Sequence, residues 1–483
     1  PESCWKNGQN SLKSCWKNGQ NNAIQYKKAD TPVIYRKIDS YLEYFYRETQ
    51  MALLLDGARQ VGKTTSIRHF GETHFKSFIE INFVRTPLAA ELFRNAAGAD
   101  EIITRLSAFA ERPLIPGQTL VFFDEVQKCP EIITAIKFLV EEGSYRYILS
   151  GSLLGTELKG LSSAPVGFMS IKRMYPLDLE EFLRALGVQD RVFTALRESF
   201  EEGRPADSVI HGRLMQLFRL YLIVGGMPAA VSKYMEHNNL QEVLTVQKSI
   251  IELYRLDISQ YDPARKLYID EIFSLIPSEL NAKNKRFILK HLNENFKFSR
   301  FHDSFIWLSA AGVALPTYNA EEPVAPLVLS KSRNLFKLFE NDVGLLASEY
   351  ADGLQLRVLN NDPGINFGGI FENFTAQELS AHGFELYYFN SKKQGELDFV
   401  IEEDGSAVPI EVKSGKDYVR HNALTNVLEN KDYDIRRAYV LCNDNVQKSG
   451  RITYLPMYMA MFIRNDRQEE KPLVYRPDLT GLA

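Results

Sequence analysis

The sequence predicts an α/β fold with a parallel sheet, followed by helices and a second α/β domain. Three observations support it: a glycine-bracketed loop after an apolar run at 53–65, an apolar run ending in two acids at 119–125, and an alternating hairpin at 395–413. Strands that alternate with helices form parallel sheets covered on both faces. The 483 residues are enough for about two to four domains.

The first element is a phosphate loop with the spacing G-x-x-x-x-G-K-T. Its nine residues are Gly57, Ala58, Arg59, Gln60, Val61, Gly62, Lys63, Thr64 and Thr65. Successive backbone N–H groups and the start of the next helix form an anion site in such loops. We expect Lys63 to reach the β- and γ-phosphates and Thr64 to bind Mg²⁺. The predicted cofactors are therefore ATP and Mg²⁺.

The second element supplies acids beside this loop. Strands are expected at 78–83 and 119–123, and the latter leads into Asp124 and Glu125. This is the Walker B pattern, in which Asp124 contributes to the metal site and Glu125 orients and deprotonates the attacking water. A further strand at 145–149 leads to Ser150 and Ser152. Either serine is placed to sense the γ-phosphate, and a plain serine-rich turn is the alternative.

Five segments together resemble prokaryotic AAA+-like ATPases that carry a conserved C-terminal domain of unassigned function. The segments are 57–65, 123–127, 149–152, 175–183 and 225–228, and the resemblance extends from about residue 30 to the end. It implies an ATP-hydrolysing core. The family usually has a Gly-Arg pair before the Pro-Leu turn. Lys172 and Arg173 are the weak substitutes here, so the sequence identifies no trans-acting arginine.

Changes in composition and periodicity predict five regions. They are a disordered tail at 1–28, the ATPase core at 29–185, a helical lid at 186–262, a winged-helix-like domain at 263–345 and a restriction-endonuclease-like domain at 346–483. The tail contains the segment Ser-Cys-Trp-Lys-Asn-Gly-Gln-Asn twice and is too polar to bury a core.

The winged-helix-like domain is predicted from three helices and a hairpin. The helices are expected at 268–276, 285–292 and 301–311, and the strands at 312–318 and 325–329. The helix at 301–311 either reads DNA or packs between domains. Its run Phe305, Ile306, Trp307 and Leu308 favours packing, since base readout needs polar side chains.

The hairpin at 395–413 gathers charged groups. Asp-Gly at 404–405 lies between two alternating runs, which is a hairpin signal. A period of two places Glu396 and Asp398 on one face of the first strand, and Glu411 and Lys413 on one face of the second. We expect Glu372, on the preceding helix, to join them.

This set matches the D-x(n)-E-x-K core of restriction-endonuclease-like folds. Glu372, Asp398 and Glu411 are then ligands of a second Mg²⁺ or Mn²⁺, and Lys413 is the catalytic lysine. Two alternatives stay open: a fold that binds in this groove without cleaving, and a salt-bridged sheet edge.

Composition limits the partners. The net charge of −4 argues against a uniformly basic surface, so contact with DNA or other nucleic acid needs a local site. Four scattered cysteines suit a cytoplasmic protein, and the apolar stretch 220–231 is shorter than the roughly 20 residues of a membrane span. We expect an ATPase whose nucleotide state controls a nuclease-like domain. A regulatory switch that recruits a protein partner through an inactive C-terminal domain is the alternative, and an oligomer suits either.

Overall fold

The chain forms two sheets, which we describe from a computed structural model. The structure describes residues 34–151, 167–261, 266–282, 285–287, 302–350, 353–362 and 367–465. Residues 1–35 and 36–483 are two separate units. The predicted tail and Ser152 lie outside the described residues.

The first sheet has five parallel strands in the order β2-β3-β4-β1-β5. The strands are β1 (Ala52–Asp56), β2 (Ser77–Asn82), β3 (Thr119–Asp124), β4 (Arg146–Ser150) and β5 (Met169–Arg173). Because β4 pairs with both β1 and β3, the carboxyl ends of these three strands are neighbours. That edge holds the phosphate loop, the two acids and Ser150, which confirms the predicted parallel α/β sheet.

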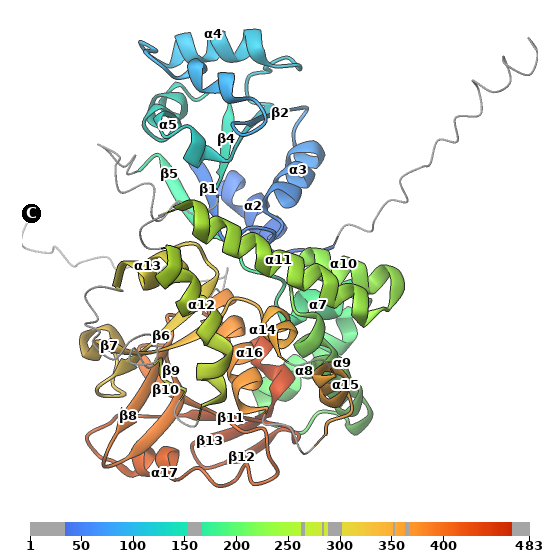
Figure 1. The fold of residues 1–483 in the computed structure, drawn as a ribbon, viewed down its shortest axis with the longest axis vertical. Helices are drawn as coiled ribbons and strands as arrows, with labels where there is room; N and C mark the ends of the chain where they lie inside the picture. The colour runs from blue at the N-terminus through green and yellow to red at the C-terminus, as the bar shows by residue number, and fades with distance from the viewer. Residues whose placement is uncertain are drawn as a thin grey trace, which may run out of the picture. The chain divides into compact units, whose positions relative to one another are not determined.

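Helices cover both faces of this sheet (Figure 1). One face packs against α2 (Lys37–Glu48) and α3 (Lys63–His74), the other against the 3₁₀ helix η1 (Pro87–Leu92), α4 (Ala99–Phe109) and α5 (Glu131–Glu142). A short 3₁₀ helix, η2 (Val126–Lys128), follows β3. Alternate strand residues serve the two faces, so Val121 and Phe123 belong to the core under α4 and α5, while Phe122 stacks on Phe78.

The region predicted as a lid is helical throughout its described part. Its helices, together with α7 before it and α12 and α13 after it, are α7 (Leu179–Ala185), α8 (Asp190–Glu202), α9 (Ser208–Val224), α10 (Pro228–His237), α11 (Leu240–Tyr261), α12 (Lys266–Asn281) and α13 (His302–Ala310). Proline at the first position of α10 suits a helix start, because the N–H it lacks has no intrahelical partner there. No helix in the described ranges combines the length and apolar character needed to cross a bilayer.

The second sheet has eight strands in the order β12-β13-β11-β10-β9-β8-β6-β7. They are β6 (Ala314–Ala320), β7 (Lys331–Glu340), β8 (Tyr387–Ser391), β9 (Gly395–Glu403), β10 (Ser406–Val412), β11 (Ala438–Cys442), β12 (Gln447–Ser449) and β13 (Ile452–Pro456). Strands β9 and β10 form the predicted hairpin. Strand β6 pairs with β8, so one sheet joins strands that the sequence assigned to two domains.

Two expected elements differ in the structure. The strand expected at 325–329 is wrong, since a 3₁₀ helix, η6 (Leu327–Ser330), occupies most of it and the strand is β7 instead. Pro323 and Pro326 explain this, because proline has no N–H for a strand ladder. Of the helix expected at 285–292, the described residues 285–287 are not helical, and the rest lies outside the described residues.

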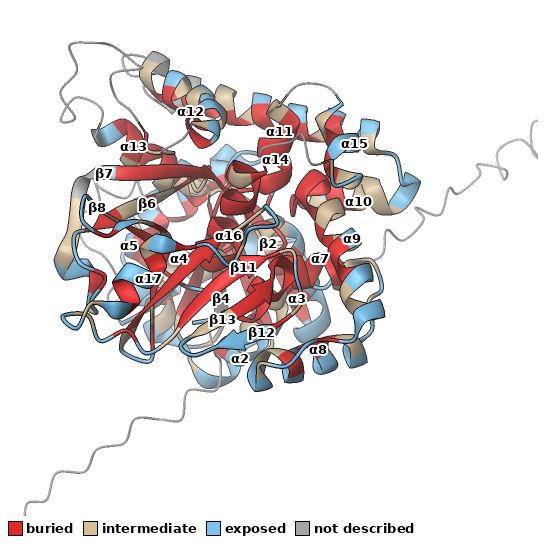
Figure 2. Ribbon diagram, turned by 90° about the horizontal axis from the view of Figure 1, so that it is seen from below, coloured by how far each residue is buried: buried red, intermediate tan, exposed pale blue. Residues whose placement is uncertain are grey.

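Helices also cover both faces of the second sheet. Helix α17 (Asn422–Glu429) packs on one face, and α16 (Gly368–Ala381) packs against β6, β7 and β10. The remaining elements are α14 (Val343–Glu349), α15 (Leu354–Leu359) and the 3₁₀ helix η7 (Met457–Phe462). Figure 2 shows α16 and the strands near it in the buried class. Glu372, Glu411 and Lys337 on that side of the sheet are therefore buried.

Candidate nucleotide site and C-terminal charge cluster

The phosphate loop depends on its two glycines. Gly57 has φ 141° and Gly62 has φ 99°, which side chains of L-residues rarely adopt. A Cβ at Gly57 would lie 2.2 Å from the carbonyl oxygen of Met174. Helix α3 begins directly after Gly62, so the first N–H groups of the helix face the loop.

Lys63 lies over the loop that precedes it. Its Nζ donates to the carbonyl oxygens of Gly57 at 2.7 Å and of Ala58 at 2.8 Å. Burial lowers the pKa of Lys63 to about 8. An anionic phosphate would favour the charged ammonium, so this position suits phosphate binding.

Asp124 is the centre of the polar groups at the sheet edge. Thr64 Oγ1 donates to Asp124 Oδ2 at 3.4 Å, Asn82 donates to the same oxygen at 2.8 Å, and the Ser150 hydroxyl donates to Oδ1. The structure thus brings Thr64, Asp124 and Ser150 together as predicted. The sequence reasoning missed Asn82, whose signal is its place at the end of β2, opposite Asp124.

Glu125 has an uncommon backbone conformation. Its φ and ψ are 58° and 46°, the left-handed region, which costs a non-glycine residue about 1–2 kcal/mol. Such local strain clusters at functional sites. Gln127 donates a side-chain hydrogen bond to the Glu125 carboxylate, which orients it beside Asp124 and within the electrostatic reach of Lys63.

Helix α11, in the region predicted to form a lid, contacts the phosphate loop directly. Arg59 forms an ion pair with Asp257 at 2.6 Å, and the Tyr254 hydroxyl donates to the Arg59 carbonyl at 3.2 Å. Both partners belong to α11. An ion pair and a hydrogen bond therefore join the phosphate loop to α11.

Arg173 and Lys172, the two weak substitutes for a trans-acting arginine, both contact other residues of their own chain. Arg173 pairs with Asp56 at 2.8 Å and donates to the carbonyls of Ser309 and Ala310 at the end of α13. Lys172 lies over the ring of Tyr41, 4.8 Å from its centroid. The buried Trp307 and Leu308 and these contacts support the packing interpretation of α13.

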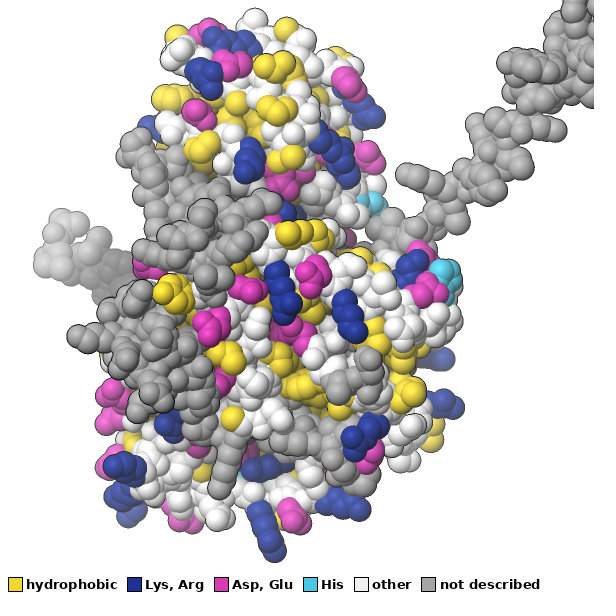
Figure 3. Space-filling model, in the orientation of Figure 1, with side chains coloured by type: hydrophobic (Ala, Val, Ile, Leu, Met, Phe, Trp, Pro, Cys, Tyr) yellow, Lys and Arg dark blue, Asp and Glu magenta, His cyan; other side chains and the backbone are white. Residues whose placement is uncertain are grey.

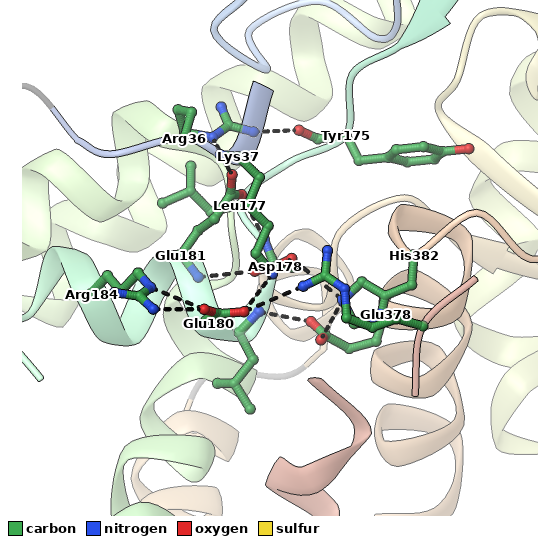
Figure 4. A network of polar contacts seen from close by, with 12 residues as sticks. Arg36, Lys37, Tyr175, Leu177, Asp178, Glu180, Glu181, Arg184, Glu378 and His382 are labelled. Carbon is green, nitrogen blue, oxygen red and sulfur yellow. Dashed lines mark hydrogen bonds and ion pairs between the residues drawn. The ribbon is translucent and has the colours of Figure 1, made fainter. Parts of the chain in front are cut away.

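Arg36 holds the phosphate loop from outside. Its guanidinium donates to the Val61 carbonyl at 2.8 Å and to the Tyr175 carbonyl at 2.8 Å, and it pairs with Glu181 at 3.2 Å (Figure 4). Arg36 is only 6% exposed. A planar guanidinium with several donors can make all three contacts at once.

The same network continues to α16. Asp178 caps α7 by accepting from the Glu181 N–H at 2.9 Å, and the Leu179 N–H donates to Glu378 of α16 at 2.8 Å. His382 lies 3.4 Å from Asp178, as Figure 4 shows. Although burial opposes it, Lys37 holds the pKa of Asp178 well below its usual range.

The C-terminal residues share one face of the second sheet, as the period predicted. Glu411 lies on β10 beside Asp398 of β9, and the Val412 N–H donates to Asp398 at 2.8 Å. Glu372 comes from α16 above this face. Burial and the neighbouring Asp398 raise the pKa of both Glu372 and Glu411, that of Glu411 to about 8.

Cations of the chain pair with these carboxylates. Lys413 is 2.7 Å from Glu411, and Lys285 forms an ion pair with Glu372. Lys337 lies 3.6 Å from Glu372 and 2.9 Å from Glu396. In the described part of the chain, no group of three or more His, Cys, Asp or Glu side chains is arranged to hold a metal ion. The sequence reasoning missed Lys285 and Lys337, which belong to no motif.

The raised pKa of Glu411 predicts a pH dependence of stability. Its value is about 8 when folded against an ordinary 4.5, so between these values the folded chain holds more protons and its free energy of unfolding falls as pH rises. Glu411→Gln should reduce this decline, by up to about 1.4 kcal/mol per pH unit. Urea unfolding from pH 5 to pH 8 measures it, with the exposed Glu429→Gln as control. Equal slopes in wild type and Glu411→Gln would contradict the assignment.

Comparison with known proteins identifies the first of these regions. A family model described as the AAA domain matches residues 49–183. Two models described as domains of unknown function match residues 215–355 (DUF8612) and 367–459 (DUF4143). No curated protein matches the chain.

Two solved structures are similar to parts of this chain. A Walker-type ATPase of Pyrococcus abyssi is 14% identical over 66% of this chain and 96% of its own, with a TM-score of 0.39. The ORC1 protein of Aeropyrum pernix, in complex with DNA, is 12% identical over 70% of this chain and 95% of its own, with a TM-score of 0.28. From the AAA match and the geometry of the phosphate loop, residues 49–183 form a AAA domain and the protein is an ATP-binding P-loop ATPase.

Proposed function

We propose that this protein hydrolyses ATP at the phosphate loop and that its nucleotide state is transmitted to the C-terminal domain. Thr64 and Asp124 offer the hard oxygen ligands that Mg²⁺ prefers, and they already lie within hydrogen-bond distance of each other. The metal would neutralise charge on the phosphates. Glu125 deprotonates the attacking water, and Ser150 senses the γ-phosphate.

One observation carries the proposed transmission: a continuous set of polar contacts runs from the loop to α16. It passes from the Val61 carbonyl through Arg36 to Glu181, and from the first turn of α7 to Glu378. Helix α16 also carries Glu372 of the charge cluster. ATP can shift α16 between two conformations only if it binds these two conformations with different affinity.

Phosphate binding at Lys63 supplies this difference in affinity. The Lys63 ammonium must leave the carbonyls of Gly57 and Ala58 to contact a phosphate. The phosphate loop then loses its hydrogen bonds to Lys63, whereas the hydrogen bond from Arg36 to the Val61 carbonyl remains. Arg36 thus converts a change in the loop into a change at Glu181 and α7.

Hydrogen exchange of α16 tests this transmission. A slowly hydrolysed ATP analogue should change amide exchange over residues 368–381 in the wild type. Arg36→Lys keeps the charge but cannot make three directed contacts, so the change in α16 should disappear while the analogue still binds. Arg68→Lys is the matched control, because Arg68 pairs with Glu80 at 2.6 Å outside this network. Exchange in wild-type α16 that does not respond to the analogue would refute the transmission.

The C-terminal domain has two candidate roles. A nucleic-acid-facing, nuclease-like domain is the first. A regulatory switch that recruits a protein partner through an inactive C-terminal domain is the second, and the ion pairs on Glu372 and Glu411 favour it. On the face seen in Figure 3, basic and acidic side chains of the described residues are interspersed. DNA binding whose logarithmic affinity falls linearly with the logarithm of salt concentration would favour the first role.

A further inference from the structure

Lys337 is a fully buried lysine at the edge of the second sheet. It lies on β7 opposite Thr317 of β6, and its side chain is 0% exposed. The ammonium lies 5.1 Å from the ring centroid of Tyr388 on β8 and reaches Glu396 on β9 at 2.9 Å. The side chain therefore extends across neighbouring strands, beneath α16, toward the carboxylates.

Pairing registers explain why these groups share a face. Thr317 and Asn319 are two residues apart on β6 and point the same way. Asn319 pairs with Tyr388, and Asn390, two residues further on β8, pairs with Glu396. Lys337, Tyr388 and Glu396 thus form a row on one face, and Asp398 and Glu411 continue it.

The formal charges of this cluster balance without an added ion. Four carboxylates face four cations: the carboxylates are those of Glu372, Glu396, Asp398 and Glu411, and the cations are Lys285, Arg286, Lys337 and Lys413. A buried ammonium is tolerated only where carboxylates compensate its lost hydration. Although burial opposes it, Glu372 and Asp398 hold the pKa of Lys337 above its usual value, so the side chain stays charged. A divalent cation would add two charges to a balanced group and be repelled by Lys337.

We propose that the Lys337 ammonium is the resident cation of this cluster, in the place where a nuclease of this type would hold a divalent metal. The C-terminal domain then neither needs a metal there nor cleaves phosphodiesters with one. This inference deepens the second candidate role, and it rests on that role alone. It makes no demand on ATP hydrolysis at the phosphate loop.

Mn²⁺ binding to the full chain without nucleotide tests this assignment. The Asp124→Asn background removes the metal ligand beside the phosphate loop, and free Mn²⁺ is followed by electron paramagnetic resonance. In that background, Asp398→Asn should leave Mn²⁺ binding unchanged. Lys337→Met should raise the affinity for Mn²⁺ at least about tenfold, equivalent to about 1.4 kcal/mol, and adding Asp398→Asn should remove the gain. Lys331→Met is the control, since Lys331 lies on the same strand over Tyr318.

Two results would overturn the proposal. The first is evidence for a metal at this cluster while Lys337 is intact. Such evidence would be binding of one Mn²⁺ per chain that Asp398→Asn removes, or Mn²⁺-dependent DNA cleavage that Asp398→Asn abolishes. The other is a folded Lys337→Met protein that binds Mn²⁺ no better than its parent. If Lys337→Met does not fold, Lys337→Met/Glu396→Gln also removes the negative charge closest to Lys337 and gives the same comparison. ATP hydrolysis, assayed with the native Asp124, tests the ATPase separately.

Discussion

Lys63→Ala is expected to abolish nucleotide binding at concentrations that saturate the wild type. The lysine is a half-buried cation of the phosphate loop, and truncating one partner of a charge pair that becomes buried costs about 2–5 kcal/mol. Alanine also leaves the carbonyls of Gly57 and Ala58 without the ammonium that now bridges them. Equilibrium titration with a fluorescent ATP analogue measures the loss.

Lys76→Ala is the matched control for this variant. Lys76 is exposed and lies between α3 and β2, at the sheet edge opposite the site, so its removal should leave affinity unchanged. Thermal unfolding of both variants shows whether the fold is kept. If Lys63→Ala bound the analogue as tightly as the wild type, the phosphate loop would not be the nucleotide site.

Glu125→Gln is expected to slow ATP hydrolysis by about 10²–10⁴-fold, the range that a positioned general base contributes, while ATP still binds. The amide keeps the shape of the side chain but cannot take a proton from water. Because the backbone at Glu125 is already left-handed, a substitution that preserves shape avoids a further change in the turn. Single-turnover hydrolysis, with ATP binding measured in parallel, separates the two steps.

Glu131→Gln provides the comparison for this second variant. Glu131 is exposed in the first turn of α5. Its replacement by glutamine removes the same charge a few residues away from Glu125. Its hydrolysis rate should equal that of the wild type. A wild-type rate in Glu125→Gln would exclude Glu125 as the base, and Asp124 would then have to be tested.

The nucleotide site was predictable because its signals are local. Glycine at 57 and 62 and the Lys63-Thr64 pair fix the loop within a few residues, and the apolar run before Asp124 marks a buried strand. Parallel strands bring their carboxyl ends to one edge, so Thr64, Asp124 and Ser150 could be expected to meet. Asn82 joins them only because β2 pairs with β3 in a register that places it opposite Asp124.

The C-terminal region shows where a local pattern stops being informative. Period two placed Glu396 with Asp398 and Glu411 with Lys413, and these positions agree with the pairing of β9 and β10. It could not show that β6 pairs with β8, because alternation marks a strand without naming its neighbour. At 325–329 the sequence carries two opposing signals: the apolar Leu-Val-Leu run favours a strand, whereas Pro323 and Pro326 disfavour one.

The sequence by itself determined the phosphate loop, the acids that follow β3 and the two-strand hairpin, because each depends on spacing within a short segment. Only the tertiary structure decided which distant cations contact these regions. Arg36 reaches the Val61 carbonyl, and Lys337 reaches Glu372 and Glu396, through strand pairing and helix packing. A buried charge requires a partner because it has lost its hydration. The sequence does not reveal that partner, because contacts between distant residues follow no periodic pattern.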